Sequence, residues 1–432
     1  MSDTHSTSRA RGFCAVRGAG GPRAALTARL PLVSLLVVLV VLVVLSFYLQ
    51  EFWLRVGFSI FGAVIGAIGL TILVGTTGQL SLGHAFFLAV GAISYCWLAS
   101  EPSDLGSRHL GGLGLPPLVA MVLAVLISGL AGLLFSPVSA RLRGIYLGIA
   151  SLGLVFVGQH VLNSATPVTG GFNGRRTPHF SLFGFAFDND DSGFAVLGVP
   201  FGRFERLWYL GLVLVVLAAW FAYGVLRSRP GRALRAVRDG EIAAAVTGID
   251  VTGYRARAFL VSSMYAGLAG VLYALSIGSV APESFTVDVS IQYLAIILLG
   301  GLGSIGGAVA GSVFVIGLPL LLEQYSENLP FLSAPGSSGV TSAEAAKYAY
   351  GAAVILFVLF QPRGLAGIAY TLVSGRRAAA LRRGSDPPPD GGGPPAGRGR
   401  AAADGAAFAG TGSVGPAGTV QADLPAGAAS GG

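Results

Sequence analysis

The sequence predicts an all-α polytopic membrane protein with about ten transmembrane or re-entrant helices. Hydrophobic residues make up 53% of the chain and charged residues only 11%, whereas about a quarter of the residues of a soluble domain are charged. The mean hydropathy of +0.71 agrees with this composition. Apolar segments of about 20 residues, the length that crosses a bilayer, recur between short polar loops. These observations exclude a water-soluble fold.

The first apolar segment, 30–49, is longer than the core of a signal peptide, which runs ~7–15 residues. No small-residue cleavage site follows it, so we expect it to remain as a helix. The expected helices occupy residues 30–49, 56–74, 80–99, 117–135, 144–162, 207–226, 256–276, 288–300, 304–322 and 346–361.

Arginine clusters predict which loops face the cytoplasm, because positively charged loops stay on that side of the membrane. The N-terminal tail, residues 1–29, contains several arginines and is predicted to lie inside. Counting crossings from there places Arg141 and Arg143 inside, the acid-containing loop 163–206 outside and the arginine-rich segment 227–257 inside.

The arginines that follow the last helix, from Arg363 onward, require an inside end. This holds only if segment 288–322 crosses twice, or dips into the membrane and returns. At about 35 residues the segment is short for two full helices, so we expect a broken pair around the glycine-rich turn from Gly300 to Gly307. The permease domain is predicted to span 30–376, and residues 377–432, rich in Gly, Pro and Ala, to form a disordered low-complexity tail.

Segment 227–257 predicts two short helices and a docking surface. Asp239-Gly240 separates the helices, Glu241 opens the second, and Gly248 ends it after a run of small residues. Arginines recur every three residues on one face of the first helix, at Arg232, Arg235 and Arg238. An ordinary positive-inside loop would explain the arginines, but not the short helix of small residues.

Polar residues at the start of the 80–99 span form a candidate substrate path: Gln79, Ser81 and His84. A broken helix there would present backbone dipoles and side-chain donors to a polar solute such as a zwitterion. The same side chains could instead hydrogen-bond across helices only to satisfy one another. No Cys, Asp, Glu or second His lies near His84, so no metal site is expected.

Five blocks of the sequence resemble the LivM-type permeases of branched-chain amino acid ABC importers. They are GQLSLGHAFFLAVGAISY, RGIYLGIASLGLVF with TGGFNG, SRPGRALRAVRDGEIAAAVTGIDVTGYRARAFLVSSMYAGLAGVLYA, SIQYLAIILLGGLGSIGGAVAGSVF and LFVLFQPRGLAGI, in the family's order. The resemblance implies a bacterial inner-membrane subunit that pairs with a second homologous permease, two ATP-binding subunits and an extracytoplasmic solute-binding protein. It also implies that the helix after Gly240 inserts into a groove on the ATPase, a role that falls on Glu241, Ala243, Ala244 and Gly248.

The expected function is therefore that of a permease subunit for leucine, isoleucine and valine, without catalytic residues, cofactor or nucleic-acid partner. The only lysine is Lys347, which lies in no P-loop pattern, so ATP hydrolysis must come from a partner. Urea or another small polar solute is the alternative substrate, because the binding protein usually decides which solute is carried.

Other classes of membrane protein fit less well. An ion-coupled secondary transporter usually places an acid or a charge pair inside the membrane, and the predicted helices contain no acid well within a segment. An intramembrane enzyme would need a nucleophile with a base, or a metal-binding set, and the histidines lie in no such arrangement. A channel would leave the docking loop without a purpose.

Overall fold

The computed structural model describes residues 36–324, apart from short gaps between 106 and 201, and isolated residues between 344 and 367. All of these belong to one compact unit, residues 1–376. The predicted tails 1–29 and 377–432 lie outside the described residues, as does most of the predicted helix 346–361.

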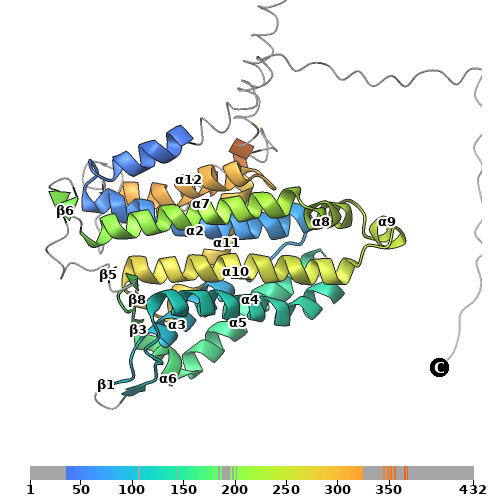
Figure 1. The fold of residues 1–432 in the computed structure, drawn as a ribbon. Coiled ribbons are helices and arrows are strands. Elements are labelled where there is room, and N and C mark those ends of the chain that lie inside the picture. Colours follow the sequence, from blue (N-terminus) through green and yellow to red (C-terminus); the bar gives the residue numbers. More distant parts are fainter. Residues whose placement is uncertain are drawn as a thin grey trace, which may run out of the picture. The chain divides into compact units, whose positions relative to one another are not determined.

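The described chain folds mainly into long apolar helices that lie side by side (Figure 1). A helical segment, Leu36–Leu45, precedes them. The others are α2 (Glu51–Thr77), α3 (His84–Ala99), α4 (Pro117–Arg141), α5 (Ile145–Ser164), α6 (Thr166–Thr169), α7 (Arg203–Arg227), α8 (Arg229–Asp239), α9 (Glu241–Val246), α10 (Val251–Ile277), α11 (Val287–Gly300) and α12 (Ile305–Gln324). Among the described residues, six helices are long and apolar enough to cross a membrane, which agrees with the predicted class.

Helices α2 and α10 form the centre of the bundle. Within their most apolar windows, 83% of the α2 residues and 72% of the α10 residues are buried, against 22–33% in α4, α5 and α7. Small residues allow the close packing that membrane helices use. The Ser128 hydroxyl of α4, for example, donates to the carbonyls of Phe87 (2.9 Å) and Ser263 (2.8 Å) and so connects three helices.

The bundle has two different ends. Helices α8 and α9 lie at one end, which we call the α9 end, and short strands lie at the other, which we call the β3 end (Figure 1). There β3 (Arg175–Arg176) pairs antiparallel with β8 (Ser279–Val280). Three further antiparallel pairs are β1 (Ser103–Leu105) with β2 (Arg108–Leu110), β4 (Ser181–Leu182) with β5 (Phe185–Ala186), and β6 (Ala195–Val196) with β7 (Val199–Pro200). The sequence did not predict these strands, because runs of two or three residues are too short for an alternating pattern.

The predicted span 80–99 is helical only from His84 onward. Helix α2 ends at Thr77 and is followed by Gly78, whose φ of 70° is left-handed. Residues 78–83 continue without helical structure to the start of α3. The predicted 80–99 span is thus present as a helix that begins four residues later than expected, and a non-helical segment precedes it.

The predicted break in segment 288–322 is also confirmed. Helix α11 ends at Gly300 and α12 begins at Ile305. A Cβ atom on Gly75 would lie 2.7 Å from the Cα of Gly303, so the turn between α11 and α12 touches the C-terminal part of α2. Helix α11 therefore runs toward the α9 end, and α12 runs back from it.

Candidate functional site

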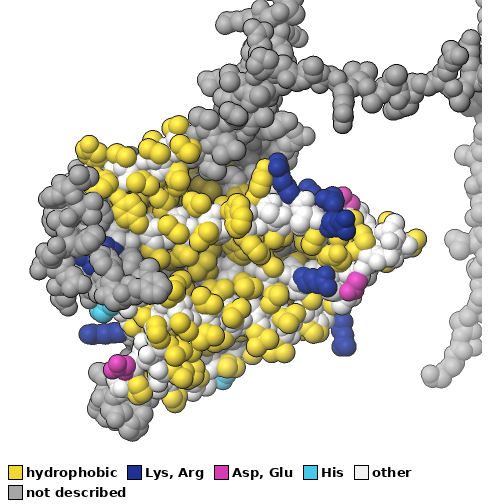
Figure 2. Space-filling view, in the orientation of Figure 1, with side chains coloured by type: hydrophobic (Ala, Val, Ile, Leu, Met, Phe, Trp, Pro, Cys, Tyr) yellow, Lys and Arg dark blue, Asp and Glu magenta, His cyan; other side chains and the backbone are white. Residues whose placement is uncertain are grey.

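Helix α9 projects from the α9 end of the bundle (Figure 1), and Lys or Arg side chains gather on the adjoining surface (Figure 2). The predicted boundaries are confirmed: α8 ends at Asp239, Gly240 is extended, and α9 begins at Glu241. Gly248, with φ of 83°, closes the turn after α9. A short helix, flanked in the sequence by polar residues and glycines, thus projects beyond the apolar helices.

The side chains that α9 presents outward differ in part from those predicted. Ala243 and Gly248 are exposed, but Ala244 is only 3% exposed and faces the protein itself. Ile242 and Val246, one helical turn apart, are 80% and 83% exposed. Sequence reasoning missed both, although two apolar residues at i and i+4 in a polar segment would have indicated them.

Glu241 forms an ion pair with Arg255 in the second turn of α10, where Arg255 is 5% exposed. Its carboxylate therefore does more than complement the positive end of the α9 dipole, the role expected from its position. The ion pair attaches the first residue of α9 to a central helix of the bundle.

Three of the four arginines on α8 bind the C-terminal ends of membrane helices. Arg232 and Arg235 donate to the carbonyls of Arg227 (3.2 Å) and Leu226 (3.1 Å) at the end of α7. Arg238 donates to the carbonyl of Gly75 (2.6 Å) near the end of α2. Cations are favourable there because a helix C-terminus carries a partial negative charge. Helices α8 and α9 are consequently fixed to two different membrane helices.

The second predicted site lies at the start of α3, where it meets α2, α5 and α11. The backbone N–H of Ala85 donates to the Ser290 hydroxyl (3.0 Å), and that of Leu82 donates to the Ser151 hydroxyl (2.8 Å). The His84 ring lies against the Tyr293 ring, with 4.9 Å between the ring centroids. Helix α3 thus begins inside the bundle rather than at its surface.

The predicted path residues Gln79, Ser81 and His84 are all buried, with 5%, 1% and 1% of their surfaces exposed. Both amide atoms of Gln79 and the Nε2 atom of His84 have no hydrogen-bond partner among the described residues. Gln79 and His84 therefore do not satisfy each other in this part of the chain. Buried polar atoms are seldom left without partners, so a ligand, water or a conformational change is expected to pair them.

A cavity of about 420 Å³ lies between α2, α10, α11 and α12 and extends toward the β3 end. Phe52, Ile277 and Gln324, which line it, belong to the ends of their helices there. Tyr293, the residue that packs against His84, also lines the cavity. The cavity and the start of α3 are therefore neighbours, separated by one aromatic ring.

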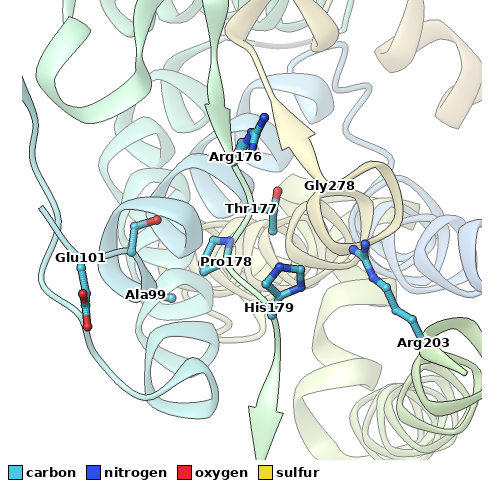
Figure 3. Close-up of a pocket in the computed structure, with 9 residues that line it drawn as sticks. Ala99, Glu101, Arg176, Thr177, Pro178, His179, Arg203 and Gly278 are labelled. Atoms are coloured by element: carbon cyan, nitrogen blue, oxygen red, sulfur yellow. The ribbon is translucent and has the colours of Figure 1, made fainter. Parts of the chain in front are cut away.

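A second pocket, of about 560 Å³, lies at the β3 end itself. Figure 3 shows His179 and Arg203 on one side of this pocket and Glu101 on the other. The adjacent Arg175 is buried and donates to the carbonyls of Val168 (2.8 Å) and Gly111 (2.9 Å). Burial lowers the pKa of the Arg175 guanidinium from its ordinary value. The pocket presents both charges to a polar partner.

The TGGFNG sequence forms a tight turn at the same end. Gly170, Gly171 and Gly174 have φ values of 78°, 61° and 63°, which favour glycine, and residues Gly171–Asn173 form a 3₁₀ turn. Phe172 is 80% exposed on this turn, an apolar side chain that sequence reasoning did not single out.

Comparison with known proteins adds to this geometry. Residues 52–360 match the family described as branched-chain amino acid transport system / permease component. The high-affinity branched-chain amino acid transport system permease protein LivM of Salmonella typhimurium is 33% identical over 312 residues, which cover 70% of this chain and 67% of the relative. LivM of Escherichia coli is 31% identical over the same shares. The ribose import permease protein RbsC of Escherichia coli is 27% identical over 247 residues, 56% of this chain and 67% of the relative. No solved structure is significantly similar.

Proposed function

Because the chain belongs to the family of branched-chain amino acid transport permeases, we propose that it is the transmembrane permease subunit of an ATP-binding-cassette importer for leucine, isoleucine and valine. An extracytoplasmic binding protein delivers the solute, a second homologous permease completes the path, and two ATPase subunits drive transport. The names of the LivM relatives support this substrate class. Lys347 is the only lysine and lies in no P-loop pattern, which supports a separate ATPase.

The observation that carries the proposal is the exposed apolar pair on α9. Ile242 and Val246 stand on a short helix at the arginine-rich end of the bundle, and both are at least four-fifths exposed. Apolar side chains held out on such a tip suit a groove on a partner protein, as in other cases of helix-in-groove recognition. We assign contact with the ATPase to Ile242, Ala243 and Val246.

The remaining predicted coupling residues then have supporting roles. Glu241, through its ion pair with Arg255, fixes the start of α9 on α10. Ala244 packs inward, and Gly248 allows the chain to turn back toward α10 through its positive φ. The α9 end is cytoplasmic in this proposal, because the arginines of α8 gather there. The N-terminal tail is then also cytoplasmic, and the β3 end faces the binding protein.

Transport in this proposal involves Gln79, Ser81 and His84 at the start of α3. They are buried between four helices. This position fits a segment of the solute path that is closed in the present state and opens when α9 moves. The unpaired atoms of Gln79 and His84 are available to a polar solute at that moment.

Co-purification tests the docking role. We expect the detergent-solubilised chain to carry a P-loop ATPase and a second permease from its native membrane. Ile242→Arg and Val246→Arg should each weaken retention of the ATPase by about 2 kcal/mol, roughly 30-fold, as for a central interface residue, and should retain the second permease. Thr252→Arg, which adds the same charge at an exposed position of α10 near this end, is the matched control and should retain both partners.

Two results would contradict the proposal at different levels. ATPase retention that is equal in Ile242→Arg, Val246→Arg and the wild type would remove the docking role from α9. A chain that purifies alone and moves solute into vesicles without ATP would remove the importer assignment altogether.

A further inference from the structure

We propose that the cavity between α2, α10, α11 and α12 binds the aliphatic side chain of the transported amino acid, so that this subunit itself selects for apolar solutes. The inference rests on the proposed function.

The cavity results from the unequal lengths of its helices. Helix α11 begins at Val287, and both Val289, in its first turn, and Gly62, in the middle of α2, line the cavity. The neighbouring helices α2, α10 and α12 extend further toward the β3 end, where Phe52, Ile277 and Gln324 line the same space. Space is therefore left beyond the start of α11, and its volume of about 420 Å³ lies within the range of small-molecule sites.

The lining of the cavity favours an apolar group. Aliphatic residues from five helices face it, namely Ala63, Leu88, Ala269, Val289, Ile316 and Leu320. Four of the polar side chains in the walls have partners: the hydroxyls of Ser59 and Ser276 bond each other at 2.9 Å, and Tyr273 bonds Ser284. A sugar would bury hydroxyls against the aliphatic part of this lining, which offers them no hydrogen-bond partner, and this is costly. A branched aliphatic side chain needs none.

A charged group lies where an amino acid would need one. Arg55, which lines the cavity near the start of α2, is exposed, and its guanidinium has no ion-pair partner among the described residues. A carboxylate placed near Arg55 with the side chain directed inward would match this distribution of charge and apolar surface.

The floor of the cavity connects it to the predicted path. Tyr293 lines the cavity and lies against His84. It approaches α2 closely at Gly66, where a Cβ atom would lie 3.0 Å from the tyrosine hydroxyl. A solute above Tyr293 is thus one side chain away from the unpaired Nε2 atom of His84, so the cavity leads toward residues with free hydrogen-bonding capacity.

Cavity size can be changed without touching the path residues. The assay is uptake by the assembled importer, reconstituted with its binding protein and ATP. Val289→Phe should reduce leucine uptake more than valine uptake and so raise the valine-to-leucine uptake ratio about tenfold. One methylene in an apolar site changes selectivity by at least that factor. Val289→Ala should shift the ratio in the opposite direction. Ile291→Phe, on the exposed face of the same helix, is the matched control and should leave the ratio unchanged.

The ratio separates a binding role from structural damage, because damage lowers the uptake of both amino acids together and the binding protein is the same throughout. If Val289→Phe fails to assemble, Val289→Ala decides alone. An unchanged ratio in the assembled variants, with uptake still driven by ATP, overturns the proposal and places selection elsewhere. A wild-type assembly without ATP-driven uptake of any branched-chain amino acid would instead refute the proposed function.

Discussion

Single glycines determine how closely the central helices approach. A Cβ atom on Gly91 of α3 would overlap the backbone of Gly267 in α10, so the two helices touch backbone to backbone at this point. Such contacts are characteristic of membrane bundles, because small residues let dispersion forces act over a large contact area. By contrast, a Cβ atom on Gly153 of α5 would meet nothing within 4 Å.

We expect Gly91→Ala to destabilise the protein by about 3 kcal/mol, the upper part of the usual range for overpacking. Gly153→Ala should be neutral or stabilising by up to about 1 kcal/mol, because alanine is the better helix former. The measurement is the Tm of the detergent-solubilised variants, followed by loss of the monodisperse peak after heating. Equal Tm values for the two variants would show that the α3–α10 contact tolerates separation.

At the scale of the element, α8 acts as a connection between α9 and the end of α2. Arg238 binds the Gly75 carbonyl, and its side-chain stem lies 3.4 Å from the Cβ position of Gly78. Gly78 begins the non-helical segment that leads to α3, and Gly75 touches the turn at Gly303. We therefore expect a movement of α9 to reach first the segment 78–83 and the turn between α11 and α12.

From this geometry, Arg238→Gln should weaken the coupling between ATP hydrolysis and transport. Loss of a partly exposed, charge-assisted hydrogen bond is worth about 1 kcal/mol, so we expect a roughly fivefold lower number of solute molecules transported per ATP in the reconstituted importer. Arg235→Gln removes an equivalent bond to the end of α7 and serves as the control, with a stoichiometry near that of the wild type. A similar loss in both variants would mean that α8 only supports α9 and transmits nothing specific to α2.

At the scale of the whole molecule, the arginines of α8 predict the orientation in the membrane. The α9 end contains the arginines of α8 together with exposed Val246, and the β3 end contains exposed Phe172. Because positively charged segments tend to stay in the cytoplasm, we expect the α9 end to lie on that side. Both residues are more than three-quarters exposed, so a reagent can reach them from the side they face.

Single cysteines at Val246 and Phe172, in a chain whose Cys14 and Cys96 are replaced by serine, test this orientation. A membrane-impermeant maleimide applied to intact spheroplasts should label Phe172→Cys and leave Val246→Cys unlabelled. After the membrane is permeabilised, both should react. Labelling of Val246→Cys in intact spheroplasts would invert the orientation and place α9 away from any cytoplasmic ATPase.

The class of the protein, the positions of most helices and the breaks at Gly240 and at the α11–α12 turn were predictable from the sequence. These features depend on local properties: the length of an apolar run, the placement of glycine, and the run of small residues after Glu241. Such properties act within one or two helical turns, so a single stretch of chain contains all the information that they need.

Only the tertiary structure decided which of these residues face a partner and which face the protein. Ala244 is buried and Ile242 is exposed, Arg238 bonds Gly75, and Tyr293 stands between His84 and a cavity. Each of these facts depends on where a distant segment packs against the residue, and no local pattern records that. The sequence by itself thus determined that a short helix and a broken span exist, whereas packing between distant helices determined what each of them can bind.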